Sequence, residues 1–242
     1  MSNPRNRGKE GRDDLLFGTE KVHATIKEAV ADMHYLLSRG YAEKSALQLV
    51  GNRHRLNVRQ QKAVQGMSAS EEQVNQRKQT ELSLEQLKGQ EIAIDGFNLL
   101  IILESALSGA YVFKGLDDCY RDLSSVHGTY KRVQQTEGAL QWVGDTLQEL
   151  QTGNVLWYFD QPVSNSGRLK TLLGEMAQEQ GYDWTIELDY NPDKLLAETD
   201  RIVVSSDAWV LDRAARWCNL AKALIESKIS IMQIVQSIVD GR

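Results

Sequence analysis

Cysteine, proline and long apolar runs are scarce in this sequence, and each scarcity excludes a class of protein. The 242 residues include only 2 Cys and no Cys-x-x-Cys pair, which argues against a disulfide framework or a thiolate zinc site. No apolar run approaches the roughly 20 residues that a membrane helix needs, and the charged N-terminus lacks the apolar segment of a secretory signal. With 3 Pro and 41% hydrophobic residues, the composition is that of a globular protein, which we expect in the cytoplasm without a membrane partner.

The net charge of −5 is distributed unevenly along the chain. Residues 1–80 hold 14 Lys/Arg and 9 Asp/Glu, a net of +5, whereas residues 81–242 hold 14 Lys/Arg and 24 Asp/Glu, a net of −10. A basic head on an acidic body indicates two modules with different roles, although solvated surfaces also vary in charge by chance.

The head has the hydrophobic periodicity of helices. Apolar residues recur at three- and four-residue spacings from Thr19 to Gly40, and a second helix is predicted from Ala42 to about Gly51. Asn57 is a candidate N-cap for a third helix. The tight break before Asn57 is typical of a helix-turn-helix arrangement.

The chain divides into segments on this pattern. We expect a mobile tail over residues 1–14 and a small basic all-α domain over residues 15–68. A polar linker or exposed helix is expected over residues 69–88, where large apolar side chains are few. Residues 89–242 form the second module.

In the second module, apolar runs alternate with helical stretches. Strands are predicted over residues 91–95, 155–160, 183–189 and 201–207, with helices between them and a long helical tail from about Ala208. Apolar strands separated by helices indicate an α/β fold with a mostly parallel sheet that is covered on both faces.

Each of the four predicted strands ends in an acidic residue. These residues are Asp95, Asp160, Asp189 and Asp207, and Asp193 opens the short helix after the third strand. Parallel strands end at the same edge of a sheet, so the carboxylates are expected to gather there. A single such Asp is usually a helix cap, but several together repel one another and generally require a cation. Oxygen ligands without His or Cys favour Mg²⁺ or Mn²⁺.

A carboxylate site of this kind suits phosphodiester hydrolysis. One or two divalent ions, roughly 4 Å apart if paired, can activate an attacking water and neutralise the leaving oxygen. In the run EIAIDGFNLL, Gly96 is expected to let the chain turn sharply after Asp95, and Asn98 to supply a neutral ligand or hold a water. A serine nucleophile is less attractive, because Ser205 and Ser206 have no evident histidine base.

Several of these runs resemble the PIN-like nuclease superfamily, particularly its NYN and flap-nuclease branches. The matching runs are IDGFNLL at 94–100, WYFDQPVSNSGRLKTLL at 157–173, NPDKLLAE at 191–198 and VVSSDAWVLD at 203–212. The resemblance covers about residues 90–225 and implies a three-layer α/β/α fold with a mostly parallel central sheet. A second resemblance, to uncharacterised proteins that pair a small helical N-terminal domain with a PIN-like domain, is carried by GYAEKSALQLVGNRHRL.

The resemblance also implies a set of site residues. The expected catalytic and metal-binding residues are Asp95, Asp160, Asp193 and Asp207, with Asn98 as a further metal-site residue. Additional candidate acids are Asp117, Asp118 and Asp212. Asp95 and Asp207 match the main ligands of the family. Many relatives carry a further acid where this chain has Trp209, so the number of metals and the activity depend on whether Asp212 compensates.

Basic residues are candidates for nucleic-acid contacts. They are Arg53, Arg55, Arg59 and Lys62 in the head, and Lys131, Arg132, Arg168 and Lys170 in the body. Phosphate contacts from such residues would give salt-dependent affinity with little sequence preference. Alternatively, they lie on solvated helix faces, and the head packs on the body or on a twin subunit. The apolar run ALIESKISIMQIVQSIV near the C-terminus is expected to pack on the sheet or to form a homodimer.

These features predict a Mg²⁺- or Mn²⁺-dependent nuclease, with RNA rather than DNA as the expected substrate. The alternative is a nucleic-acid-binding or assembly protein that keeps the PIN-like fold with a weakened site. A metal-dependent phosphatase fits less well, because the Asp-Gly-x-Asn run lacks the Asp-x-Asp that such enzymes carry.

Overall fold

The structure, a computed structural model, describes residues 7–124, 128–228 and 233–237. Its helices are α1 (Asp13–Phe17), α2 (Glu20–Ser38), α3 (Glu43–Arg53), α4 (Val58–Met67), α5 (Glu71–Thr80), α6 (Gly96–Leu107), α7 (Thr136–Glu149), α8 (Ser166–Gln180), α9 (Pro192–Glu198), α10 (Ala208–Leu211) and α11 (Leu220–Lys228), with a 3₁₀ helix η1 (Leu84–Leu87). Its strands are β1 (Glu81–Leu82), β2 (Ile92–Asp95), β3 (Tyr111–Lys114), β4 (Tyr120–Arg121), β5 (Val155–Asp160), β6 (Trp184–Asp189), β7 (Ile202–Val204), β8 (Trp217–Cys218) and β9 (Gln233–Gln236). None of the helices in the described ranges is long and apolar enough to cross a membrane.

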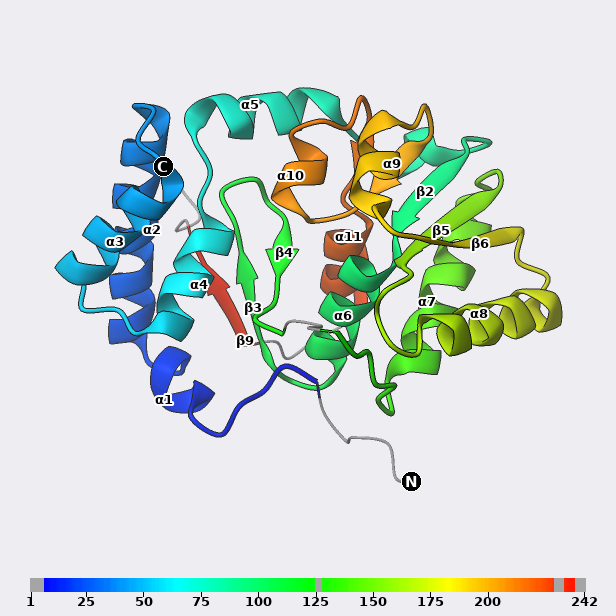
Figure 1. Ribbon diagram of the computed structural model, residues 1–242, viewed down its shortest axis with the longest axis horizontal. Coiled ribbons are helices and arrows are strands. Elements are labelled where there is room, and N and C mark those ends of the chain that lie inside the picture. The colour runs from blue at the N-terminus through cyan, green and yellow to red at the C-terminus, as the bar shows by residue number, and fades with distance from the viewer. Residues whose placement is uncertain (1–6, 125–127, 229–232, 238–242) are drawn as a thin grey trace.

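Six strands form a central sheet in the order β1-β8-β7-β2-β5-β6, and every neighbouring pair is parallel. The four strands predicted from the sequence are β2, β5, β6 and β7, and they are consecutive in the sheet as β7-β2-β5-β6. The protein is therefore an α/β protein with a parallel central sheet and an N-terminal helical region, as the sequence predicts (Figure 1).

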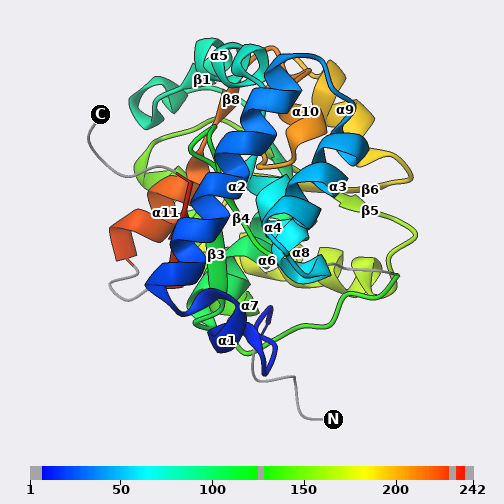
Figure 2. The ribbon, with the colours of Figure 1, turned by 90° about the vertical axis from the view of Figure 1, so that its left-hand side faces the viewer.

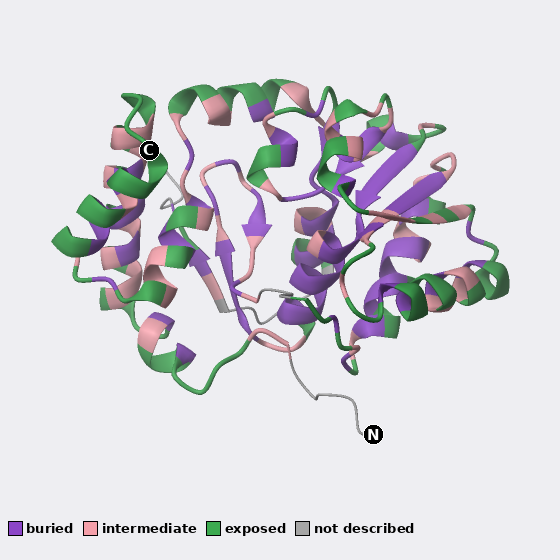
Figure 3. Ribbon diagram, viewed as in Figure 1, coloured by how far each residue is buried: buried purple, intermediate pink, exposed green. Residues whose placement is uncertain are grey.

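Helices cover both faces of the central sheet because β2 is apolar on both sides. Ile92 and Ile94 pack into a core with buried residues of α6, α7 and α8, whereas Ala93 belongs to a second core with Leu196 of α9 and Leu211 of α10. All four residues of β2 are buried, and Figure 3 shows β2 and β5 mostly buried, whereas the edge strand β6 has no buried residue. Unbroken apolar strands covered on both faces give the three layers of an α/β/α arrangement.

The helices of the head begin where their capping residues predict. The Thr19 hydroxyl accepts a hydrogen bond from the Val22 backbone N–H at 3.3 Å at the start of α2. Asn57 and Gln60 form a reciprocal capping box at the start of α4. Arg55, at φ 52°, lies in the tight turn between α3 and α4. Figure 2 shows α2, α3 and α4 packed together beside β3.

The head shares its apolar core with the body. Ile26, Met33 and Val64 of the head pack in one cluster with Phe113 of β3 and Val235 of β9. These two strands belong to a small sheet, in the order β4-β3-β9, that the sequence does not predict. The basic helices are therefore fixed to the body through apolar side chains.

The described part of the N-terminal tail is ordered, which corrects the expectation of a mobile tail. Residues 7–14 are held by Arg59, whose guanidinium donates to both carboxylate oxygens of Asp13, at 2.6 and 2.8 Å. The same guanidinium donates to the Gly8 carbonyl at 3.0 Å. Residues 1–6 lie outside the described ranges.

The C-terminal segment differs from the long helix expected from about Ala208. It forms α10, β8, α11 and β9, and residues 229–232 and 238–242 lie outside the described ranges. β9 pairs in parallel with β3, so this part of the apolar run packs in the small sheet. Its Ile234 and Val235 are β-branched, which favours an extended backbone over a helix.

The segment expected as a linker or exposed helix, residues 69–88, is an ordered connection. In Figure 1, α5 runs from the head toward α10 in the body, and β1 then joins the central sheet by pairing with β8. Arg77 on α5 is 2% exposed and ion-pairs with Asp117 and Asp212 of the body, at 2.6 Å each. A buried and paired arginine fixes this helix to the body, because separating the pair would leave charges buried without partners.

Candidate active site

The carboxyl ends of β2 and β7 meet where the chain changes direction across the central sheet. After β2 the chain adds β5 and β6 on one side, and it returns with β7 on the other. Ile94 of β2 is paired with Val204 of β7, so the residues that follow these strands are neighbours. Crevices at such switch points are the usual ligand sites of parallel α/β sheets.

Asp95 ends β2 and caps α6. Its Oδ1 accepts a hydrogen bond from the Asn98 backbone N–H at 3.4 Å, and its Oδ2 accepts one from the Ser205 hydroxyl at 2.8 Å. Asp95 is 8% exposed, and this burial raises its pKa to about 7. The Ser205 hydrogen bond lowers the pKa in part, whereas the negative charges of Asp193 and Asp207 raise it. Asp95 is therefore both a cap and a buried carboxylate whose ionised form lacks compensation.

The two serines after β7 join the ends of the two strands. Ser205 Oγ, which donates to Asp95, also accepts a hydrogen bond from the Asp207 backbone N–H at 3.0 Å. The Asn98 side-chain oxygen accepts from both the backbone N–H and the hydroxyl of Ser206, at 2.8 Å each. The sequence predicts a neutral ligand at Asn98, but its oxygen is engaged in this way, so Asn98 braces the loop after β7.

Asp207 stands at the start of α10. One of its carboxylate oxygens, Oδ1, accepts hydrogen bonds from the backbone N–H groups of Trp209 at 2.8 Å and Val210 at 3.1 Å. Its Oδ2 has no hydrogen-bond partner within the described ranges, so this oxygen is available to a ligand.

Two further predicted acids extend this group. Asp193, in the first turn of α9, has its pKa raised by partial desolvation and then by the negative charges of Asp207 and Asp160. Burial raises the pKa of Asp160 at the end of β5. Asp189, at the end of β6, instead accepts a hydrogen bond from the Asn191 backbone N–H at 2.7 Å and caps the turn before α9. We call Asp95, Asp160, Asp193 and Asp207 the acidic group.

The acidic group is open rather than a closed ligand cage. Among the described residues, no three His, Cys, Asp or Glu side chains are placed to hold one metal ion together. Zn²⁺ sites generally need three or four protein ligands, so the group does not fit that ion. Mg²⁺ keeps several waters and is commonly bound through one or two carboxylates and substrate phosphates, which is compatible with Asp95 and Asp207.

Gly96 is required by packing rather than by a turn. It is the first residue of α6, and a Cβ placed there would lie 2.3 Å from the Phe159 ring. The sequence predicts a sharp change of direction at this glycine. The chain does pass at Gly96 from β2 into α6, as predicted, but the close approach of Phe159 of β5 is what excludes a side chain there.

A cleft of about 610 Å³ lies between Asp207, the member of the acidic group that lines it, and the head. Asn98, Asp207 and Trp209 line its body side, and Lys62 and Gln65 of α4 line its head side. Its volume lies within the roughly 300–1,000 Å³ of pockets that bind organic ligands. The packing of the head against the small sheet therefore creates a cavity at the predicted site.

Arg121 of β4 also lines the cleft, and sequence reasoning does not identify it. Its Nε donates to the Ser206 carbonyl at 2.9 Å, and its two terminal nitrogens donate to Asp117 at 2.8 and 2.6 Å. β4 has two residues, so no periodic pattern marks it. Ser205 and Ser206 had a signal, because they stand between an apolar strand and Asp207.

Two of the additional candidate acids lie in ion pairs apart from the acidic group. Asp117 is buried between Arg77 and Arg121. Burial alone would raise the pKa of Asp117, but the two arginines outweigh it and hold the pKa at about 2. Asp212 pairs with Arg77 and so joins α5 to the body, and it also lines the same cleft as Asp207.

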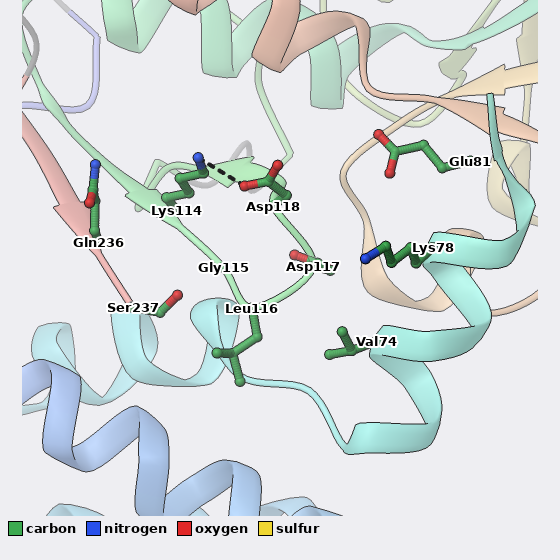
Figure 4. Close-up of a pocket in the computed structure, with 10 residues that line it drawn as sticks. All are labelled: Val74, Lys78, Glu81, Lys114, Gly115, Leu116, Asp117, Asp118, Gln236 and Ser237. Carbon is green, nitrogen blue, oxygen red and sulfur yellow. Dashed lines mark ion pairs between the residues drawn. The ribbon is translucent and has the colours of Figure 1, made fainter. Parts of the chain in front are cut away.

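Asp118, the third additional acid, lines a second hollow of about 340 Å³ between α5 and the small sheet. It ion-pairs with Lys114 at 2.8 Å and also with Lys222. Figure 4 shows the Lys114–Asp118 pair on one side of this hollow, with Lys78 and Glu81 on the other. Because its charges are balanced, this hollow lacks the excess of negative charge that marks the acidic group.

The candidate phosphate-binding residues of the head differ in their surroundings. Arg59 is occupied by the N-terminal segment, and Arg53 forms an exposed ion pair at 3.3 Å. Arg55 is exposed in the turn before α4. Of these four residues, Lys62 is the one that lines the cleft.

The candidate residues of the body lie away from the cleft lining. Arg132 ion-pairs with Glu137, and Lys131 is exposed beside it. Arg168 and Lys170 are exposed on α8, which follows the loop after β5. None of these four basic residues lines the cleft beside Asp207.

Two protein families match the chain, and their boundary falls at the short strand β1. Residues 25–80 match "Protein of unknown function (DUF434)", and residues 84–223 match "Domain of unknown function (DUF5616)". The chain is similar to "Uncharacterized protein MJ0935" of Methanocaldococcus jannaschii, with 28% identity over 76% of this chain and 90% of that protein. No solved structure matches the chain. The match over residues 84–223 spans more than half of this chain, so the protein belongs to the family described as "Domain of unknown function (DUF5616)".

Proposed function

We propose that the protein is a Mg²⁺- or Mn²⁺-dependent nuclease with a PIN-like fold, which hydrolyses phosphodiester bonds in RNA. One observation carries the proposal: four acids from separate elements gather at the switch point of a parallel sheet without forming ion pairs among the described residues. Arg121 interacts with Asp207 electrostatically, yet its ion pair is with Asp117. Uncompensated carboxylates of this kind favour a bound cation.

A divalent ion fits the chemistry of these donors. Asp95 and Asp207 would hold the ion, because they follow adjacent strands. The negative charge of Asp207 also contributes to the raised pKa of Asp95, so the two carboxylates interact. When bound, such an ion lowers the pKa of an attacking water and neutralises charge on the leaving oxygen. Only one oxygen of Asp207 is committed to the α10 cap.

The remaining residues have supporting roles in this proposal. Asp160 and Asp193 are less buried than Asp95, so they are placed to accept hydrogen bonds from waters at the rim of the site. Asn98, Ser205 and Ser206 fix the two strand ends relative to each other through the hydrogen bonds described above. Such bracing keeps carboxylates in position, which a catalytic site requires.

The direct test is cleavage of a labelled single-stranded RNA in Mn²⁺, with and without EDTA. Asp95→Asn and Asp207→Asn should each reduce cleavage roughly 100-fold or more, because they remove the residues expected to hold the ion. Asp189→Asn is the matched control, since Asp189 ends a neighbouring strand outside the acidic group, and it should cleave as the wild type does. Cleavage that persists in EDTA or in both group variants contradicts the proposal.

A second candidate function is nucleic-acid binding without cleavage. It is favoured by the open geometry of the acidic group, in which no three described acids share one ion, and by the engagement of the Asn98 oxygen. RNA binding in EDTA combined with stable RNA in Mg²⁺ and Mn²⁺ would support this function. A DNA strand of the same sequence, tested in parallel, distinguishes the two nucleic acids.

A further inference from the structure

We propose that Trp209 and Arg213 form a stacking platform for an unpaired base of a nucleic-acid strand bound in the cleft. This inference rests on the proposed function, because it names the form of the substrate that the same site would bind. It requires that Trp209 be accessible, held in place and directed to the cleft.

Trp209 is the tryptophan that the fold leaves open. Its side chain belongs to a residue that is 44% exposed, whereas Trp142, Trp157 and Trp217 are buried. Isolated exposed aromatic residues are common on protein surfaces. Trp209, however, lines the same cleft as Asp207, which lies two residues before it in the chain, so a strand that reaches Asp207 through this cleft would pass the indole.

The indole is held at its place before any ligand binds. Its backbone N–H donates to Asp207 Oδ1 at 2.8 Å, which ties the residue to the acidic group. The guanidinium carbon of Arg213 lies 4.1 Å from the ring centroid, in a cation–π contact. Arg213 Nη1 also donates to the Trp209 carbonyl at 3.0 Å. A platform fixed in this way loses little conformational freedom when a base stacks on it.

The walls of the cleft suit a nucleotide strand better than an apolar peptide. Its charged lining is mixed, with the basic residues Lys62, Arg77, Arg121 and Arg213 and the acids Glu43, Asp122, Asp207 and Asp212. Arg77 and Arg121 are paired with Asp117. Lys62 on α4 and Arg213 beside Trp209 are therefore the cations of this lining that could meet phosphates near the aromatic ring. Gln65 and Ser68 add polar groups on the head side. Aromatic rings with cations beside them are the usual means of binding single strands without sequence preference, and Trp209 with Arg213 provides such a pair.

An unpaired base is required because stacking uses the face of the base. In a duplex these faces are covered by neighbouring bases, whereas in single-stranded RNA they are open to aromatic side chains. The platform therefore selects single strands, loops or ends. It also gives Trp209 a role at the position where many relatives of the resembled superfamily carry an acid.

The test measures binding alone, in EDTA, with the full chain. The ligands are a fluorescein-labelled 12-nucleotide RNA, the same length of abasic ribose-phosphate chain, and a blunt RNA duplex. Trp209→Ala should weaken binding of the single strand roughly 5- to 150-fold, the range for loss of one stacked base. Trp209→Phe should retain most of the affinity, because it keeps an aromatic face. Neither substitution should change binding of the abasic chain or the duplex by more than about 2-fold.

Three results would overturn the platform. The first is equal affinity of wild type and Trp209→Ala for the single strand, and the second is an equal loss for the abasic chain. The third is the absence of nucleic-acid binding by the wild type. Because Trp209 is exposed, the variants should have the melting temperature of the wild type, and matching melting temperatures show that lost binding does not reflect unfolding.

A second readout reports on the indole itself. Iodide should quench the fluorescence of the wild type more strongly than that of Trp209→Phe, in which the half-buried Trp184 is the most exposed tryptophan, and saturating RNA should reduce quenching in the wild type alone. Because no step of this experiment requires cleavage, a failed cleavage assay in Mn²⁺ leaves it readable. Conversely, cleavage that depends on Asp95 but not on Trp209 would retain the proposed function and reject the platform.

Discussion

At the scale of single residues, Asp95 decides how the site responds to pH and to cations. It is buried, it caps α6, and its carboxylate faces the negative charges of Asp193 and Asp207. Burial is the largest cause of its raised pKa, and these two acids add to it. Without a metal, the folded protein is therefore less stable when Asp95 is ionised.

Asp95→Asn should stabilise the protein at high pH in EDTA. The pKa of Asp95 is about 7 in the folded state against 3.8 in its ordinary state, so the wild type loses stability as the pH rises from about 4 to 7. The loss corresponds to as much as about 4 kcal/mol, at 1.36 kcal/mol per pKa unit. Urea unfolding at pH 4.5 and pH 8 measures it. Asp189→Asn is the control and should show no such pH-dependent gain.

This prediction fails if the difference in unfolding free energy between Asp95→Asn and the wild type is the same at pH 4.5 and pH 8. Adding Mn²⁺ at pH 8 should reverse the order of stability, because a bound cation stabilises the wild type and the variant lacks a ligand for it.

At the scale of elements, α5 links the head to the site. Arg77 is buried on α5 between Asp117 and Asp212, and Arg121 shares Asp117 with it. Arg121 in turn holds the Ser206 carbonyl, so a chain of polar contacts runs from α5 to the loop after β7.

Arg77→Met should destabilise the protein by roughly 3–5 kcal/mol, because it leaves the buried carboxylate of Asp117 with one partner fewer. Urea unfolding at pH 7 is the measurement. Gln76→Ala is the matched control, since Gln76 on the same helix makes only an exposed hydrogen bond to the Asp212 carbonyl at 2.8 Å. If Arg77→Met lowers the free energy of unfolding by less than about 1 kcal/mol, Arg121 alone is sufficient to compensate the buried charge of Asp117.

The elements that the sequence predicted are those with local signals. Apolar periodicity from Thr19 marks α2, the cap residue Asn57 marks α4, and four apolar runs mark β2, β5, β6 and β7. The sequence does not predict the small sheet. Its strand β3 pairs with β9, which follows almost all of the body in the chain, and no local pattern encodes a partner so distant in sequence. The same limit applies to the site. The strand-end acids were visible, whereas Arg121 and the engaged oxygen of Asn98 depend on contacts made by other elements.

At the scale of the whole molecule, the head and the body share one apolar core, and the cleft lies between them. Met33 of α2 is fully buried in that core together with Phe113 of β3. The two parts that match separate families are therefore expected to unfold together.

Met33→Ala should lower the unfolding midpoint of the whole chain, with a loss of about 2–5 kcal/mol. All tryptophans lie after residue 140, so their fluorescence reports on the body, whereas far-UV circular dichroism also reports on the helices of the head. Both signals should shift together. A shift of the circular dichroism signal without the fluorescence signal would show that the head unfolds separately.

The most direct test of the account is a crystal structure of the protein soaked in Mn²⁺, with anomalous scattering used to locate the ion. We expect anomalous density between the carboxylates of Asp95 and Asp207, with waters completing the coordination. The same soak of Asp207→Asn should lack that density. Density that is absent from the wild type, or that lies instead at the Asp118 hollow of Figure 4, would contradict the central claim.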